Sequence, residues 1–539
     1  MAASLSAACV PSTFSNLALF GGDILSINTA LVANYTAFVA SELRLTSPSI
    51  AVENATFCNV TVSYTHPGQD DNILVETWLP IENPAWNGRL EAVGGGGWAA
   101  GRIYLSYETM KGALGDGFAT TTTDAGLGSA ESPATWALNS PGNINWYNVH
   151  NFASVSLNDQ AIISKSLISS FYGRGPDFSY WNGCSQGGRQ GVMLAQRYPT
   201  AYDGISAGAP VLYTSLTGST LYWPQQVMNM LRTYPYGCEM DAIAAAAIAA
   251  CDGLDGLVDG IVSDPDACLA AFDPFPLIGT PVPNCRQAGN RTVEIGVAAA
   301  VVVNATWHGI VTATGRSTWH GYSPGSDISA EGNGGFELGG IAATNCSSGT
   351  CVGSPLALAT PWFEQLLARG DPNFNLSGLT YFEFDELVHM GRQIYRAAID
   401  TDDPDLSRFR DAGGKMVTWH GLWDALIPAK ATEQYYNEVM ALLPEVHDFY
   451  RHFEIPGLGH CFGRRSGQPS SLFDQLRAWV ENGTAPEQSP VNVTVLDGTV
   501  QQRVICPYPQ TAVFADEGCR GDVGESCWSC AAGNSGAEK

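Results

Sequence analysis

A serine, an aspartate and a histidine occur in this chain in the order and surroundings typical of a serine hydrolase. The serine stands in Gly183-Cys184-Ser185-Gln186-Gly187, a G-x-S-x-G motif between a strand-like run and an expected helix. Glycine is needed because side chains two positions before or after the serine would collide in so tight a turn. A plain glycine-rich turn has the same pattern. The motif therefore predicts a nucleophile only if the chain also supplies a base and an acid.

His460 and Asp424 are the candidates for that base and acid. In α/β hydrolases the triad follows the order Ser, Asp or Glu, His, with the last two on loops after late strands. His460 follows the strand-like run 449–455 in a glycine-rich loop, and Asp424 follows the hydrophobic run 415–419. We predict that Asp424 accepts a hydrogen bond from Nδ1 of His460, fixing its tautomer and stabilising the imidazolium. The alternatives are a histidine outside the site and an aspartate that caps a helix.

Two backbone N–H groups are needed to bind the oxyanion that forms when the serine attacks. The amide of Gln186, directly after the nucleophile, is the first candidate. The second is expected from the glycine run 94–97, at Gly95 and Gly96, where bare backbone can approach a substrate. A phosphate-binding loop is excluded, because no Gly-Lys-Ser/Thr follows this run.

Two cysteines adjoin the proposed catalytic residues. Cys184 precedes Ser185, and Cys461 follows His460. When the serine and the histidine meet, the two sulfur atoms are brought close together. We therefore predict a disulfide that ties the nucleophile turn to the histidine loop, the alternative being two unrelated buried thiols.

The elements that position these residues form an α/β pattern. Strands that alternate with helices indicate a mostly parallel sheet, and between 211 and 402 the pattern changes to an inserted region rich in alanine, glycine and aspartate. We predict an α/β-hydrolase catalytic domain of residues 1–210 and 403–539 and a lid domain of residues 211–402. The expected strands are 60–64, 73–79, 90–93, 177–181, 415–419 and 448–455, and the expected helices are 154–171, 189–198 and 471–481.

The Cys-Ser…Asp…His-Cys arrangement resembles the fungal and bacterial tannase and feruloyl esterase family, which also includes hydrolases of aromatic-polyester monoesters. The resemblance implies a secreted α/β hydrolase with a large lid between nucleophile and acid, and serine esterase activity on esters of phenolic acids such as ferulate and gallate. It covers nearly the whole chain and is carried by Cys58-Asn-Val-Thr-Val-Ser-Tyr-Thr-His66, the glycine run, Gly183-Cys-Ser-Gln-Gly-Gly-Arg189, Pro456-Gly-Leu-Gly-His-Cys461 and Cys506-Pro-Tyr-Pro509.

Within this family we favour a feruloyl esterase, because the lid contains no dibasic processing site like that of some fungal tannases. A tannase, or another hydrolase of aromatic esters, is the alternative. The expected substrate is a small or polysaccharide-linked aromatic ester. An inactive, calcium-stabilised glycoprotein that only binds aromatic or polysaccharide ligands is the alternative from another class, and the intact Ser, Asp, His and glycine run argue against it.

A calcium loop is expected in the lid, where Asp252, Asp255 and Asp259 stand within eight residues. Closely spaced carboxylates repel one another unless a hard cation gathers them, and Ca²⁺ prefers oxygen ligands. The spacing is not that of an EF-hand, and on spacing alone a solvated acidic turn is an equal alternative. The resemblance implies a structural Ca²⁺ site that also uses the backbone carbonyls of Leu257 and Ile261.

The remaining cysteines are paired by weaker arguments. A bridge between Cys251 and Cys268 would brace the acidic loop. The resemblance suggests the pairs Cys9–Cys58 and Cys238–Cys285, and proximity suggests Cys346–Cys351. Three connectivities stay open for the tail cysteines, Cys506, Cys519, Cys527 and Cys530.

Composition narrows the function class further. The 539 residues carry a formal net charge of −26, which argues against nucleic-acid binding because phosphate contacts need a basic surface. No apolar run approaches the roughly 20 residues that span a bilayer. The even cysteine count and nine glycosylation sequons indicate a secreted, extracellular glycoprotein, and the oligomeric state is left open. The sequon asparagines are Asn34, Asn54, Asn59, Asn290, Asn304, Asn345, Asn375, Asn482 and Asn492.

Overall fold

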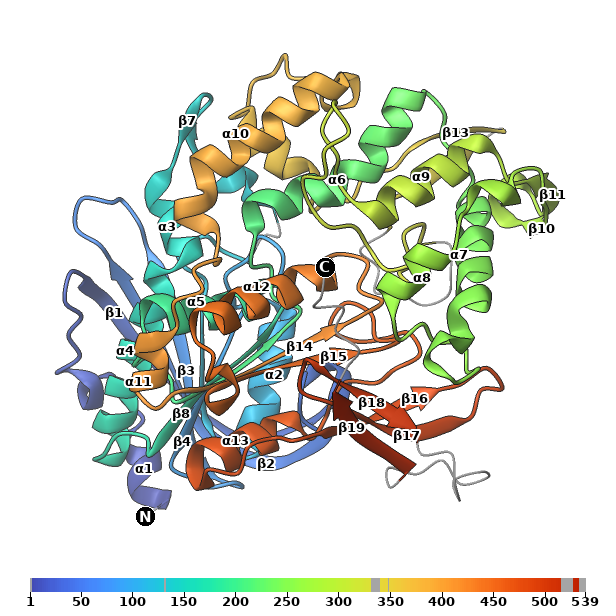
Figure 1. Ribbon diagram of the computed structural model, residues 1–539. Coiled ribbons are helices and arrows are strands. Elements are labelled where there is room, and N and C mark those ends of the chain that lie inside the picture. The colour runs from blue at the N-terminus through green and yellow to red at the C-terminus, as the bar shows by residue number, and fades with distance from the viewer. Residues whose placement is uncertain (1, 130–131, 331–339, 348, 515–526, 533–539) are drawn as a thin grey trace.

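A nine-stranded sheet forms the centre of the computed structural model, which describes residues 2–129, 132–330, 340–347, 349–514 and 527–532 (Figure 1). The six strands from β5 to β15 pair in parallel, and the three before them pair antiparallel. In sheet order the strands are β1 (Asp23–Val39), β2 (Ile50–Thr65), β3 (Ile73–Glu82), β5 (Ala119–Thr123), β4 (Arg89–Val93), β8 (Phe178–Cys184), β9 (Gly204–Gly208), β14 (Lys415–Gly421) and β15 (Tyr450–Ile455).

Helices cover both faces of this sheet, because successive side chains of a strand point to opposite faces. In β8, Trp181 packs against Gly191 of one helix, while Tyr180 packs edge-on against Phe473 of another, with ring centroids 5.7 Å apart. The helices that pack on the sheet are α2 (Tyr104–Gly115), α4 (Val155–Tyr172), α5 (Gln186–Arg197), α12 (Ala429–Leu442) and α13 (Leu472–Asn482).

The strands and helices expected from the sequence lie within or overlap observed elements. The sequence patterns do not predict the long β1 or the short β5 and β9. Beyond α13 the chain forms two small antiparallel hairpins, seen at the lower right of Figure 1. Their strands are β16 (Ser489–Thr494), β17 (Val500–Ile505), β18 (Gln510–Phe514) and β19 (Trp528–Ala532).

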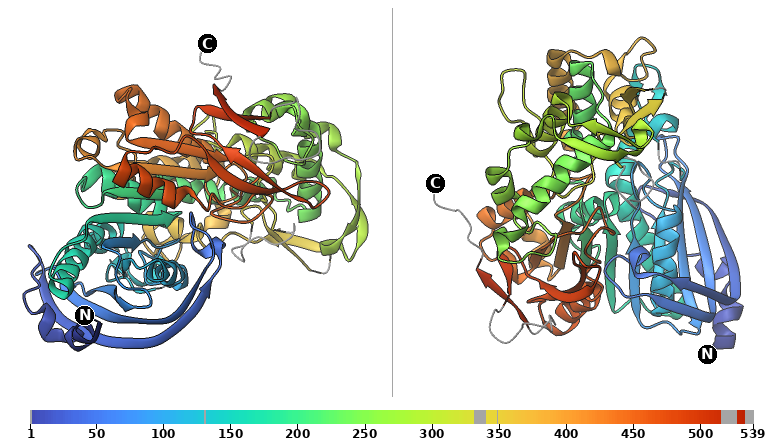
Figure 2. Two further views of the ribbon diagram at one scale, coloured as in Figure 1. Left: turned by 90° about the horizontal axis from the view of Figure 1, so that it is seen from below. Right: turned by 90° about the vertical axis from the view of Figure 1, so that its right-hand side faces the viewer.

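Residues 211–402 form a largely helical region that contributes no strand to the large sheet, as far as the structure describes it. Figure 1 and the right-hand view of Figure 2 show its helices gathered at one end of the molecule. A Cβ at Gly218 would lie 2.4 Å from the buried Trp362, so close packing requires glycine there. The longer helices of this region are α6 (Thr214–Leu231), α7 (Gly237–Cys251), α9 (Val297–His308) and α10 (Tyr381–Ile399).

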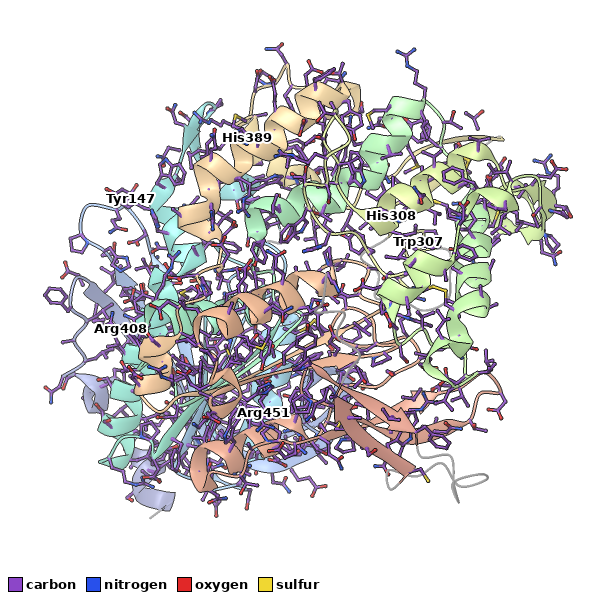
Figure 3. All side chains as sticks on the ribbon, in the orientation of Figure 1. Tyr147, Trp307, His308, His389, Arg408 and Arg451 are labelled. Atoms are coloured by element: carbon purple, nitrogen blue, oxygen red, sulfur yellow. A yellow bond between two sulfur atoms is a disulfide. The ribbon has the colours of Figure 1, made fainter. Side chains whose placement is uncertain are left out.

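Helix α9 shows how this region divides its side chains between core and solvent. Trp307 is buried with 2% of its surface exposed, whereas the next residue, His308, is exposed (Figure 3). The helix ends at Gly309 (φ +79°), where a Cβ would lie 2.2 Å from the carbonyl oxygen of Trp319. Glycine is therefore needed both for the backbone conformation and for the close approach of the following chain.

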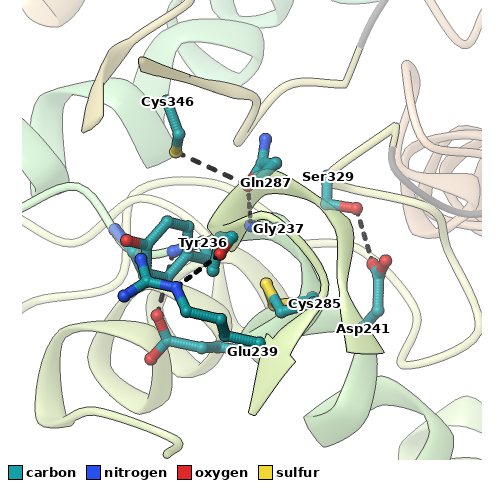
Figure 4. Close-up of a disulfide and its surroundings, with 12 residues drawn as sticks. Tyr236, Gly237, Glu239, Asp241, Cys285, Gln287, Ser329 and Cys346 are labelled. Carbon is teal, nitrogen blue, oxygen red and sulfur yellow. Dashed lines mark hydrogen bonds between the residues drawn. A yellow bond between two sulfur atoms is a disulfide. The ribbon is translucent and has the colours of Figure 1, made fainter. Parts of the chain in front are cut away.

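Disulfides join segments that are distant in sequence. Cys238 at the start of α7 is bonded to Cys285 at the end of β10 (Pro281–Cys285), and beside them Gly237 donates its N–H to Gln287 Oε1 at 2.7 Å (Figure 4). Of the tail cysteines, Cys506 pairs with Cys530, and Cys519 lies outside the described residues. The other bonds present are Cys9–Cys58, Cys184–Cys461, Cys251–Cys268 and Cys346–Cys351.

Arg189 anchors the helix that follows the predicted nucleophile. This buried side chain of α5 donates to the carbonyl oxygens of Ala153 and Phe152, at 2.9 and 3.1 Å, and to Gln186 Oε1 at 2.9 Å. Burial lowers the pKa of its guanidinium to about 9, so it remains charged at neutral pH. The charge-assisted hydrogen bonds fix the start of α5 against the helix that ends at Ala153.

Within the described residues, no helix is long and apolar enough to cross a bilayer.

Candidate active site

Ser185 stands at the junction of β8 and α5 in a strained backbone conformation, with φ 63° and ψ −123°. Non-glycine residues rarely adopt a positive φ, and such strain is concentrated at functional sites. A Cβ at Gly183 would lie 2.6 Å from the carbonyl carbon of Gly187, so the turn excludes larger residues on both sides of the serine. The serine N–H donates to the carbonyl oxygen of Gly208 at 2.9 Å, which fixes the turn to β9. This is the geometry of a nucleophile elbow.

The structure brings Asp424 and His460 together. Asp424 lies in the turn after β14, and His460 lies in the loop after β15, the parallel neighbour of β14. Their side chains meet with 2.7 Å between His460 Nδ1 and Asp424 Oδ2. The other oxygen, Oδ1, accepts the N–H groups of residues 426 and 427 at 2.7 and 2.9 Å. The carboxylate is thus oriented towards the imidazole from a fixed position.

The pKa of Asp424 is lowered far below its usual range although the residue is fully buried. Burial alone would raise this pKa, but the charge of His460 and hydrogen bonds from His420 and His460 lower it by more. The carboxyl group is therefore ionised at neutral pH. An ionised partner at Nδ1 is what a histidine needs to act as a general base at Nε2.

A cavity of about 450 Å³ contains both Ser185 and His460 in its wall. The Cys184–Cys461 disulfide, with 6.1 Å between its Cα atoms, joins the residues next to them. Most of the other lining residues are apolar, including Leu43, Leu45, Val93, Ile103, Leu105, Leu358, Trp423, Leu426 and Phe462. A nucleophile, a base and an apolar pocket together can carry out acyl transfer on an aromatic ester.

The region 211–402 contributes to the cavity and fixes the acid loop. Leu358 lines the cavity, and its carbonyl oxygen accepts the indole N–H of Trp98, beside the glycine run, at 3.0 Å. Ser326 donates its hydroxyl to the backbone carbonyl of Asp424 at 3.0 Å, and Tyr322 donates to the carbonyl of Leu426 at 3.1 Å. Residues 211–402 therefore help to position the triad and to line the cavity.

The structure leaves two of the three predicted oxyanion donors as candidates and places the N–H of the third in another hydrogen bond. Gln186 begins α5 beside the serine, and Gly96 lines the cavity, so for these two the role remains a prediction. The prediction for Gly95 fails in this geometry, because its N–H donates to Gln190 Oε1 at 3.0 Å. Sequence reasoning missed Gln190, whose side chain also donates to the carbonyl of Ala100 at 2.8 Å and so orders the glycine run. A glutamine five residues after the nucleophile, on the face of α5 towards this loop, was the available signal.

The predicted calcium ligands lie in the loop that follows α7. Asp252 and Asp259 are buried, and Asp252 Oδ1 accepts the N–H groups of residues 259–261 at 2.7 to 3.1 Å. Asp259 Oδ2 pairs with Arg503 at 2.6 Å, whereas Asp255 is exposed. Oxygen donors of this kind suit Ca²⁺, but no group of three metal-binding side chains is assembled anywhere in the described residues. The loop in this conformation therefore fits the ion only in the type of its donors.

The sequon asparagines are exposed at seven of the nine positions. Asn304 and Asn59 are partly buried. Asn59 Nδ2, the atom that would carry a glycan, donates to Glu76 Oε1 at 3.0 Å on the surface of the large sheet. This contact disfavours a glycan at Asn59 in the folded chain, and the glycan there stays a prediction.

Comparison with known proteins gives matches over nearly the whole chain. A family model described as "Tannase and feruloyl esterase" matches residues 58–528. A probable feruloyl esterase of Arthroderma benhamiae is 36% identical over 86% of this chain and 84% of its own length. A tannase of Aspergillus oryzae is 31% identical over 85% and 83%, and a mono(2-hydroxyethyl) terephthalate hydrolase of Piscinibacter sakaiensis is 28% identical over 95% and 90%.

Solved structures match equally completely. The tannin acyl hydrolase of Aspergillus niger superimposes with a TM-score of 0.83 at 27% identity, covering 98% of this chain and 94% of that one. Feruloyl esterase B of Aspergillus oryzae gives a TM-score of 0.76 at 24% identity, covering 98% and 100%. The likeness to feruloyl esterase B shows a shared α/β-hydrolase fold.

Removing the Cys184–Cys461 disulfide is expected to impair catalysis more than folding. In the double variant Cys184→Ala/Cys461→Ala, the histidine loop loses its covalent link to the elbow, so we expect kcat for an aryl ester to fall by about tenfold or more, since a misplacement of about 1 Å can cost a hundredfold. The control is the double variant Cys346→Ala/Cys351→Ala. It removes a disulfide whose two cysteines are five positions apart in the sequence and do not line the cavity. Equal kcat in both double variants and wild type, measured at a temperature where circular dichroism shows all three folded, would contradict this expectation.

Proposed function

This chain belongs to the tannase and feruloyl esterase family, and from that premise we propose that it is a serine carboxylic-ester hydrolase that cleaves esters of phenolic acids. The observation that carries the proposal is the 2.7 Å contact between Asp424 and His460, in a loop bonded through Cys184–Cys461 to the elbow that presents Ser185. Base, nucleophile and cavity are thus assembled from segments that lie far apart in sequence.

The first half of the proposed reaction forms an acyl-enzyme. Ser185 Oγ attacks the ester carbonyl carbon while His460 Nε2 takes the hydroxyl proton. Asp424 accepts the Nδ1–H of the resulting imidazolium and stabilises its charge. The amide of Gln186, together with that of Gly96, is proposed to bind the oxyanion. His460 then gives its proton to the leaving alcohol as the C–O bond breaks.

The second half releases the acid. A water molecule enters the place of the alcohol and loses a proton to His460 as its oxygen attacks the acyl carbon. The tetrahedral intermediate collapses, Ser185 regains a proton from His460, and the phenolic acid leaves. The same three residues thus serve both halves, and the strained elbow keeps Oγ exposed to substrate throughout.

A feruloyl ester is the proposed substrate class, with a galloyl ester as the alternative. The named feruloyl esterase relative is 36% identical, against 31% for the tannase. The mainly apolar cavity wall supports a substituted aromatic ring as the acyl group. Both relatives act within the same reaction type, so this preference concerns ring substituents and not mechanism.

A panel of methyl ferulate, methyl caffeate and methyl gallate tests the proposal. We expect the highest kcat/KM on methyl ferulate and no turnover of any of the three by Ser185→Ala, which loses the nucleophile but keeps the fold. The matched control is Ser169→Ala, an exposed serine in α4, which should retain full activity. Retained turnover in Ser185→Ala would reject the mechanism, preference for methyl gallate would favour a tannase, and an inert wild type would favour a ligand-binding protein.

A structural calcium ion in the loop 252–261 is a further part of the proposal. It is supported by the hard oxygen donors of Asp252, Asp255 and Asp259 with the carbonyls of Leu257 and Ile261, and by the Cys251–Cys268 bond that braces the loop. Burial raises the pKa of Asp259, an effect opposed by Arg503, so additional positive charge would stabilise its carboxylate. Binding requires the loop to close until Asp255 joins the two buried aspartates.

Chelation tests this calcium proposal. If free Ca²⁺ is present at about 100 times its Kd, binding adds about 2.7 kcal/mol to the free energy of unfolding. Removal of the ion should therefore lower the melting temperature by several degrees. Asp255→Asn should abolish the effect of added Ca²⁺, while the control Asp497→Asn, at an exposed turn, should preserve it. A purified protein without calcium by metal analysis, and a melting temperature unchanged by a chelator, would reject the site.

Secretion and glycosylation complete the proposal. The disulfides support an oxidising compartment, because such bonds are rare in the reducing cytosol. The asparagines at which we propose glycans are exposed, namely Asn34, Asn54, Asn290, Asn345, Asn375, Asn482 and Asn492, with Asn304 as a partly buried eighth.

A further inference from the structure

A second histidine contacts the carboxylate that orients the catalytic base. His420 is the penultimate residue of β14, and its side chain is completely buried. Its Nε2 lies 3.1 Å from Asp424 Oδ2, the same oxygen that accepts from His460. His420 does not line the cavity, so it reaches the reaction only through Asp424. Neither the sequence motifs nor the mechanism above gives this residue a role.

The neighbours of His420 determine where its proton lies. Nε2 faces Asp424 Oδ2 and also the carbonyl oxygen of Ile427 at 3.2 Å, and both are acceptors only. Nε2 must therefore carry a hydrogen. On the other side, Nδ1 lies 2.8 Å from Oγ1 of the buried Thr432 in α12, and a hydroxyl can donate to this nitrogen. A neutral ring with its hydrogen on Nε2 satisfies every one of these contacts.

The local chain makes this arrangement rigid. Gly421 follows His420, and a Cβ there would lie 2.3 Å from the carbonyl oxygen of Leu458 in the histidine loop. The Trp423 N–H donates to that same carbonyl at 3.0 Å. The turn that holds Asp424 is thus packed directly against the loop that holds His460. A change in the orientation of the Asp424 carboxylate would therefore change the position of His460.

We propose that His420 is a positioning residue for the reaction, donating its Nε2–H to Asp424 so that the carboxylate is held in the orientation that accepts from His460. This inference rests on the proposed esterase function. The donation also draws electron density from Oδ2 and weakens its attraction for a protonated His460. His420 therefore limits how readily His460 becomes trapped as the imidazolium, and Thr432 fixes the ring that does so.

Other titratable groups near His420 do not account for such an effect. On β15, burial lowers the pKa of His452 to about 3, so this ring is neutral. Glu454 lies opposite His420 in the pairing of β14 with β15. Burial, followed by the charge of Glu433, raises its pKa to about 8, so it would affect the alkaline limb of a pH profile and not the acidic one. Tyr322, from the inserted region, has a pKa raised well above 10 by burial and the charge of Asp424. The charged side chains of α12 on this side are Lys430 and Glu433, which pair with each other at 2.7 Å.

The test compares His420→Leu, which has no donor, with His420→Gln, whose amide can replace Nε2–H. Turnover of methyl ferulate by wild type and its loss in Ser185→Ala are established first, so that failure of the proposed function is recognised separately. For His420→Leu we expect kcat to fall about tenfold or more, as for the loss of a hydrogen bond to a charged group, with KM unchanged within about twofold. The acidic limb of the kcat/KM profile should move to higher pH, and His420→Gln should recover most of both effects.

Controls separate positioning from mere packing. His452→Gln changes a neighbouring buried histidine that contacts Thr418 and not Asp424, and it should retain the wild-type kcat and profile. Thr432→Val should shift the profile in the same direction as His420→Leu, whereas Thr432→Ser, which keeps the hydroxyl, should not. This second pair decides the question if His420→Leu does not fold. Wild-type kcat and profile in His420→Leu, or equal losses in the Leu and Gln variants with an unmoved acidic limb, would overturn the proposal.

Discussion

The buried carboxylate of Asp424 is the constraint on which the rest of the site depends. A charge that is buried away from water needs hydrogen bonds or an opposite charge from the protein, and a buried charge without either would be strongly destabilising. Here the charge is compensated from every side: by the amides of residues 426 and 427, by His420 and by His460. Meeting this requirement brings the end of β14, the histidine loop and the start of α12 into one arrangement. The base is oriented as a result.

The nucleophile is held by a different kind of interaction. Ser185 has a positive φ, which persists only where the surroundings over-determine the backbone. Close glycine contacts on both sides of the turn and the buried guanidinium of Arg189 supply that restraint. The Cys184–Cys461 bond then joins the strained elbow to the histidine loop, so the two halves of the triad cannot separate. The inserted region adds hydrogen bonds to the acid loop and completes the cavity.

Sequence reasoning located the triad because its order, its glycines and its flanking cysteines are local patterns. It placed most strands of the parallel part of the sheet but missed β1 (Asp23–Val39), an edge strand in which only Val39 is buried. The engagement of Gly95 by Gln190 and the partial burial of Asn59 beside Glu76 depend on how separate segments pack, and the contact of His420 with Asp424 depends on the turn that follows β14. No motif in the sequence marks the contacts of Asn59 and His420, whereas the position of Gln190 five residues after the nucleophile was a signal for its contact with Gly95.

The central claim is that Ser185 is an activated nucleophile and not merely a serine in a strained turn. Incubation with an aryl phosphonate fluoride, followed by peptide mass spectrometry, measures this directly, because only a serine with a general base and an oxyanion site reacts rapidly. The account predicts one adduct per chain, on the peptide that contains Ser185, with the rate of labelling falling as His460 becomes protonated. No adduct, or an adduct on a different residue, would contradict it.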